Sequence, residues 1–145
     1  MTAPKVPTPL VYVDTSIYLA ILLGEKAGLS WASKLAKRTL CSSSLMILEA
    51  ERNLVRLSRS GNLSEEDYQI AFQRVREDKD KFVLREFNLR LCLTGQYPAV
   101  QVPRSLDLVH LRTALWFYQH GGMEGFASLD QNQIKTAREL GLPIL

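Results

Sequence analysis

Four carboxylates stand where the chain passes from one predicted element to the next. Asp14 and Asp130 each follow a short apolar run that predicts a β-strand. Asp107 lies in the first turn of a predicted helix, and Glu49 lies one turn into the helix that follows another strand. Packing such groups together raises their pKa values by mutual repulsion unless a cation neutralises them. The four positions therefore predict one acidic site that binds a divalent metal ion.

The residue types near these carboxylates indicate which metal and which reaction to expect. The two cysteines, Cys41 and Cys92, are far apart and have no histidine at ligand spacing, which argues against zinc. Hard oxygen ligands favour Mg²⁺, with Mn²⁺ as a substitute. Such a site lowers the pKa of a bound water for attack on phosphorus and stabilises the leaving oxygen, so no nucleophilic side chain is needed. The expected reaction is phosphodiester hydrolysis.

The elements that must position these side chains alternate between strand and helix. Strands are predicted at residues 10–13, 39–41, 82–87, 125–129 and 142–145, and helices at 17–23, 27–38, 45–59, 64–75, 89–97, 105–120 and 133–140. Serines 42–44 and Ser105 are the N-cap candidates of two of the helices. This alternation predicts an α/β fold with a mostly parallel sheet, whose ligand groups gather beyond the carboxyl ends of the strands.

Composition bounds the class of protein without indicating its function. A chain of 145 residues with 46% apolar and 23% charged residues is typical of one soluble domain. A net charge of +3 is compatible with a polyanionic partner but does not require one. The prolines among the first nine residues predict a flexible leader, which leaves residues 10–145 as the domain. No signal-peptide core or membrane span is present, so we expect a cytoplasmic protein without a membrane partner.

Four motifs in chain order carry a resemblance to a known family. They are Tyr12-Val-Asp-Thr-Ser16, Ser44-Leu-Met-Ile-Leu-Glu49, Ser105-Leu-Asp-Leu-Val-His-Leu111, and Ser128-Leu-Asp130 followed by Ala137-Arg-Glu-Leu-Gly-Leu-Pro143. Together they resemble the successive motifs of PIN-domain nucleases, in particular VapC-type toxins of type II toxin–antitoxin systems. The resemblance covers nearly the whole chain, except that residues 82–103 match poorly and Ser128 stands where many relatives have threonine.

This resemblance implies a single-domain α/β/α sandwich and a Mg²⁺-dependent endoribonuclease. For the toxin branch it also implies inhibition by a protein antitoxin, and for the family it implies a homodimer. Asp14 and Asp107 would be the main metal ligands, and Glu49 and Asp130 would complete the pocket directly or through waters. The supporting hydroxyls would be those of Thr15, Ser16 and Ser128.

Each acidic position also has a simpler explanation. Asp14 is a favoured N-cap residue, Asp107 suits the first turn of a helix, and Asp130 suits a turn. Glu49 alone would be a solvated helix residue, with Glu51 as a substitute in the site. Taken together, the four positions favour a site over coincidence.

Several other side chains have open roles. We expect His110, one turn after Asp107, to be a packed histidine, because metal-activated water makes a general base unnecessary. Arginines on the helix of residues 45–59, and further cations elsewhere, either line an RNA path or form solvated helix faces. The arginines of that helix are Arg52, Arg56 and Arg59, and the further cations are Arg104, Arg112, Lys135 and Arg138. The apolar residues Ile17, Ala20, Ile21 and Leu29 predict a groove for an antitoxin segment.

Other function classes have weaker support. A phosphatase of the haloacid-dehalogenase type carries a second Asp two residues after the first, where this chain has Ser16. A receiver-like phosphoacceptor would need paired acids near the N-terminus, and nucleotide binding would need a P-loop or Rossmann glycine pattern, and the chain has neither. The remaining alternative is a catalytically silent PIN-fold module that binds RNA or a protein.

Overall fold

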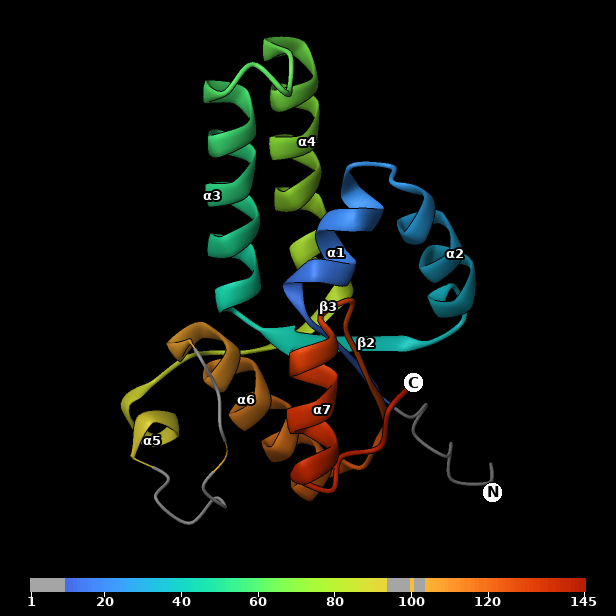
Figure 1. The fold of residues 1–145 in the computed structure, drawn as a ribbon, viewed down its shortest axis with the longest axis vertical. Coiled ribbons are helices and arrows are strands. Elements are labelled where there is room, and N and C mark those ends of the chain that lie inside the picture. The colour runs from blue at the N-terminus through green and yellow to red at the C-terminus, as the bar shows by residue number, and fades with distance from the viewer. Residues whose placement is uncertain (1–9, 94–99, 101–103) are drawn as a thin grey trace, which may run out of the picture.

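The computed structural model describes residues 10–93, 100 and 104–145 (Figure 1). The predicted leader over residues 1–9 lies outside these residues. The same holds for residues 94–97, the second half of the helix predicted over residues 89–97, which begins as α5 (Leu89–Cys92).

A four-stranded sheet forms the centre of the molecule. Its strands are β1 (Leu10–Val13), β2 (Thr39–Ser43), β3 (Phe82–Arg85) and β4 (Met123–Ala127), in the order β3-β2-β1-β4. All three neighbouring pairs are parallel. Parallel neighbours need crossover connections, which the helices between the strands supply. The predicted parallel α/β sheet is confirmed.

Helices cover both faces of the sheet, as Figure 1 shows. One face carries α1 (Thr15–Leu22), α2 (Lys26–Leu35), α3 (Leu45–Arg59) and α4 (Glu65–Asp78), which a short 3-10 helix (Lys79–Lys81) connects to β3. The other face carries α6 (Ser105–Gly121) and α7 (Gln131–Glu139). None of the helices in the described ranges has the length and apolar character needed to cross a bilayer.

Alternation along β1 divides the interior into two cores. Val11 and Val13 pack into the core beneath α1 to α4, whereas Tyr12 packs into the core beneath α6 and α7. Successive strand residues point to opposite faces of a sheet, so one strand supplies both layers. The two cores confirm the predicted α/β/α sandwich.

Helix α3 has the predicted bounds, and only some of its apolar residues are buried. The fully buried ones are Met46, Ala50 and Leu54. Leu48 is 62% exposed and Val55 is 42% exposed. The buried residues are four apart, so they form one stripe, and that stripe packs against the core under α1 and α4.

Two local predictions were wrong, those of the closing strand and of the Ser105 N-cap. The closing strand over residues 142–145 is reduced to a single parallel bridge between Phe126 and Ile144. Of the serines at 42–44, Ser44 is the N-cap residue of α3 as predicted, but its hydroxyl accepts from the Phe87 amide, while the Ser43 hydroxyl accepts from the Leu45 amide. Ser105 is the first residue of α6 rather than its N-cap.

The apolar residues of the first two helices that were expected to line a groove do not share one exposed surface. Ile17 and Ala20 are buried in the core, while Leu29 is 66% exposed. The two helices pack closely at Gly28, where an added Cβ would lie 2.0 Å from the Ala20 carbonyl oxygen. Two of the four residues therefore belong to the core, and the docking of an antitoxin segment stays a prediction.

Candidate acidic active site

The sheet order brings three of the predicted acids to one edge of the fold. Strand β1 lies between β2 and β4, so the segments that leave these three strands are neighbours. Asp14 follows β1 directly, Asp130 follows β4 by three residues, and Glu49 lies in α3 just after β2. The Asp14 amide donates to the Ala127 carbonyl at 3.1 Å, which ties the ends of β1 and β4 together. This edge is where parallel sheets place ligand-binding groups.

Asp14 is a buried N-cap. Its Oδ1 accepts from the Ser16 amide at 3.0 Å and from the Ser16 hydroxyl at 2.5 Å, and the residue is only 5% exposed. Burial raises the pKa of Asp14, although hydroxyl donors at Ser128 and Ser16 and the nearby His110 pull it down. The capping role is therefore real. Capping needs only an acceptor oxygen, however, which an uncharged side chain could supply. Because burying a charged carboxylate is costly, capping alone does not explain why an aspartate stands here.

Two serines join the start of α1 to the loop before α7. The Ser16 hydroxyl accepts from the Leu129 amide at 2.9 Å, and the Ser128 hydroxyl accepts from the Asp130 amide at 3.0 Å. The two hydroxyl oxygens are 3.5 Å apart. These contacts hold the backbone of Asp14 against that of Asp130, and a role of the two serines in supporting a metal site stays a prediction.

Asp130 and Asp107 stand at the starts of two helices. Asp130 is exposed and caps α7, with Oδ1 accepting from the amides of residues 132 and 133. Asp107 is half-buried in the first turn of α6, and its carbonyl accepts from the Gln133 side chain at 2.9 Å, which ties α6 to α7. The two predicted acids are therefore carried by helices that are fixed to each other.

The pKa of Asp107 is raised partly by other carboxylates of the predicted site. Burial is the largest cause that raises the pKa of Asp107, followed by the charge of Asp130, and the charge of Glu49 adds to the effect. Arg104 and His110 act in the opposite direction. Like charges interact in this way only when they are near one another. Asp107 is therefore repelled by two of the other predicted carboxylates, Asp130 and Glu49.

Glu49 is held by a buried hydrogen-bond network. The Thr15 hydroxyl donates to Glu49 Oε1 at 2.8 Å, and His110 Nε2 lies 2.6 Å from the same oxygen and 3.1 Å from the Thr15 hydroxyl. On its other side, His110 Nδ1 lies 2.8 Å from Tyr12 Oη. His110 is 3% exposed and Tyr12 is 0% exposed. The expectation of a packed histidine is confirmed.

The partners on either side of His110 fix where its protons lie. A carboxylate oxygen only accepts, so the proton toward Glu49 is on Nε2. Burial raises the pKa of Tyr12 well above its usual value, so the phenol keeps its proton and can donate it to Nδ1, the nitrogen that accepts in a neutral imidazole with its proton on Nε2. The chain of donors therefore runs from Tyr12 through His110 to Glu49. The role of Tyr12 was missed, because a tyrosine within an apolar strand is typical of plain core packing.

The donor chemistry fits a divalent cation, but the carboxylates are not assembled around one point. Within the described residues, no three His, Cys, Asp or Glu side chains lie close enough together to hold a metal ion as they are arranged. Hard carboxylate oxygens and the repulsion felt by Asp107 are nevertheless what a Mg²⁺ site presents before its cation binds. The single pocket predicted from the sequence stays a prediction.

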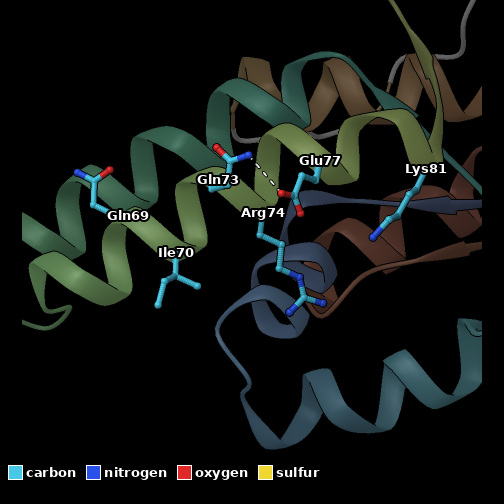
Figure 2. Close-up of a pocket in the computed structure, with 6 residues that line it drawn as sticks. All are labelled: Gln69, Ile70, Gln73, Arg74, Glu77 and Lys81. Carbon is cyan, nitrogen blue, oxygen red and sulfur yellow. Dashed lines mark hydrogen bonds between the residues drawn. The ribbon is translucent and has the colours of Figure 1, made fainter.

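An open groove lies elsewhere, along α4, with a volume of about 570 Å³. Figure 2 shows its lining, in which Ile70 and Arg74 extend from α4 toward the side of α1 and α2, and the Gln73 amide donates to Glu77 at 3.2 Å. The full lining is Gln69, Ile70, Gln73, Arg74, Glu77 and Lys81. None of the four predicted carboxylates is among these residues, so the groove is separate from the acidic site.

Comparisons with known proteins identify the family. No curated protein was found to match this chain. The PIN domain family model matches residues 11–144, a range that includes all four predicted carboxylates and Tyr12 and His110. PIN domains are commonly nucleases, generally bind nucleic acid and generally use divalent metals. The match covers nearly the whole chain, and the chain therefore belongs to the PIN-domain family.

Proposed function

We propose that this protein is a Mg²⁺-dependent endoribonuclease that also accepts Mn²⁺, and that it is the toxin of a cytoplasmic toxin–antitoxin pair. One observation carries the nuclease proposal. The charges of Asp130 and Glu49 both raise the pKa of Asp107 near the edge where Asp14 is buried, within a family whose members are commonly nucleases. Such a set of acids favours a cation, because a cation removes the repulsion.

Asp14 and Asp107 are the proposed main ligands, with Glu49 and Asp130 completing the site directly or through waters. When bound, Mg²⁺ would lower the pKa of a coordinated water and stabilise negative charge on the scissile phosphate and its leaving oxygen. The chain's own residues position the carboxylates. Ser16 and Ser128 fix the backbone of Asp14 against that of Asp130.

Glu49 is positioned by a second set of contacts. Thr15 and His110 both donate to its Oε1, which leaves Oε2 for other ligands. Because Tyr12 holds the far nitrogen of His110, the imidazole cannot rotate without losing a buried hydrogen bond. Of the predicted supporting hydroxyls, that of Thr15 therefore acts on Glu49, whereas those of Ser16 and Ser128 act on the two aspartates.

The antitoxin and the homodimer rest on the resemblance of the four sequence motifs to VapC-type toxins. A small neighbouring reading frame that encodes a DNA-binding protein would support the antitoxin, and co-purification of its product with this protein would establish the pair. Sedimentation of the purified protein would report whether it is a dimer. A monomer that forms no complex with the neighbouring product would contradict the toxin assignment while leaving the nuclease untouched.

The nuclease proposal is tested by incubating purified, partner-free protein with mixed cellular RNA in Mg²⁺, in Mn²⁺ and in EDTA. The compared proteins are the wild type, Asp14→Asn, Asp107→Asn and the control Asp80→Asn, an exposed aspartate just before β3 at the opposite edge of the sheet. We expect metal-dependent cleavage by the wild type and the control, and none by the other two. Cleavage in EDTA, or cleavage that survives both substitutions, would overturn the proposed site. No cleavage by folded, metal-loaded wild type would favour the silent binding module.

A further inference from the structure

The face of α3 that presents Glu49 continues as a row of arginines. Arg52, Arg56 and Arg59 follow Glu49 by three, seven and ten residues, so at 3.6 residues per turn all four side chains fall within an arc of about 80°. All three arginines are exposed, and the buried residues Met46, Ala50 and Leu54 occupy the opposite side of the helix. We call these three residues the arginine face.

The arginine face is not neutralised within the fold. Among residues 10–93, 100 and 104–145, no carboxylate forms an ion pair with any of the three arginines, and Arg56 makes only a 3.3 Å hydrogen bond to the Asn53 side chain. Other arginines are engaged: Arg38 pairs with Glu124, and Arg85 lies over the Trp116 ring. A row of unpaired cations raises the local positive potential and attracts polyanions.

Helix stability alone does not account for this row. Arg56 and Arg59 lie in the last turn of α3, where cations favourably oppose the helix dipole. Arg52 lies in the middle of the helix and has no such role. At 1.5 Å per residue, Arg52 stands about 4.5 Å and Arg59 about 15 Å from Glu49 along the helix axis. The row therefore begins next to the acidic site and leads away from it.

We propose that the arginine face binds the phosphate backbone of single-stranded RNA that enters the acidic site. Guanidinium groups pair well with phosphate oxygens, and such contacts fix the position of a strand without reading its sequence. Leu48 and Val55 are exposed beside the arginines and offer apolar contact to unpaired bases, which a duplex keeps in its interior. The proposal rests on the proposed function, because it assigns the substrate path of the same site.

Salt-dependent binding tests this assignment without requiring cleavage. The Asp14→Asn protein, expected to be inactive, is titrated with a short labelled single-stranded RNA of mixed sequence between about 50 and 200 mM salt. The same background then carries Arg→Gln at all three positions, Arg→Lys at all three, or the control Lys37→Gln, an exposed cation just before β2 at the far edge of the sheet. Thermal melts verify that each variant is folded.

Each lost phosphate contact lowers the slope of log K against log salt by about 0.7 for a single strand, so the triple Arg→Gln protein should lose about 2 from its slope and bind more weakly. The triple Arg→Lys protein should keep the slope, and Lys37→Gln should change nothing. An unchanged slope in the triple Arg→Gln protein, while the wild type still cleaves RNA with metal, would refute the RNA path and leave the nuclease standing. Failure of the Asp14→Asn protein to bind RNA, together with an inactive wild type, would refute both. A changed oligomeric state with unchanged RNA binding would show that the face contacts protein instead.

Discussion

The Tyr12 to His110 hydrogen bond predicts a coupling free energy that can be measured in stability. Tyr12→Phe removes only the hydroxyl, and leaves the buried Nδ1 of His110 without its donor. His110→Leu removes the acceptor of the Tyr12 hydroxyl, and also the donor on the other side to Glu49. A buried polar group without its partner costs about 1–3 kcal/mol. Each single substitution should therefore lower the free energy of unfolding by at least that amount.

The double variant should lose less than the sum of the two single variants. With both partners gone, no orphaned donor or acceptor remains at the former Tyr12–His110 contact, so the non-additivity should be about 1–3 kcal/mol. Urea denaturation of the metal-free protein measures all four free energies of unfolding. Tyr68→Phe is the control, because this half-buried tyrosine on α4 belongs to the other core and should add to His110→Leu without coupling. Additivity of Tyr12→Phe and His110→Leu within about 0.5 kcal/mol would refute the hydrogen bond between the two side chains.

Three further predictions concern other buried groups. Burial raises the pKa of Asp14 above its unfolded value of about 3.9, so the metal-free protein should gain stability as pH falls through the raised pKa toward 3.9, and Asp14→Asn should abolish this gain in pH-dependent melts. Gly28→Ala should lower the free energy of unfolding by about 1–3 kcal/mol or more, because the new Cβ would overlap the Ala20 carbonyl; an unchanged melting temperature would contradict the close approach of α1 and α2. Asp78→Ala should cost about 1–3 kcal/mol in urea denaturation, because the buried Tyr18 hydroxyl loses its acceptor at 3.0 Å, and a neutral result would show that this contact is not formed.

Locally encoded elements were predicted well. The helix expected at residues 45–59 has the bounds of α3, since an amphipathic run preceded by serines and followed by Gly61 carries its own start and stop signals. Strand β1 likewise has the expected bounds, because it is a short apolar run that ends at a capping aspartate. Both signals lie within a few residues of the element that they specify.

The face that a helix buries is set by its neighbours and is harder to predict. Helix α3 carries two apolar stripes, one with Leu48 and Val55 and one with Met46 and Leu54, and both have helical spacing. Only the position of α3 against α1 and α4 decides that the second stripe is buried. The prediction of a strand over residues 142–145 was wrong for a similar reason. The pairing of this segment depends on how closely it can approach β4 at Gly125.

In the candidate site, too, local features were predicted from the sequence and long-range contacts were not. Asp14 and Asp130 were predicted as candidate site residues because each stands at or shortly after the end of a strand, which is a local feature. The pair of Tyr12 and His110 was not found, because the two residues are 98 positions apart and meet only across the core beneath α6 and α7. The alternation of strands and helices does not fix the strand order, and it is this order that places Glu49 beside Asp14.

The most direct test of the acidic site is anomalous diffraction from crystals of the wild-type protein soaked in Mn²⁺. We expect a Mn²⁺ peak in contact with carboxylate oxygens of Asp14 and Asp107, with Glu49 and Asp130 next to it directly or through waters. The peak should disappear in Asp14→Asn crystals treated in the same way. A wild-type protein that cleaves RNA with Mn²⁺ yet shows its only peak away from these four carboxylates would contradict the proposed site.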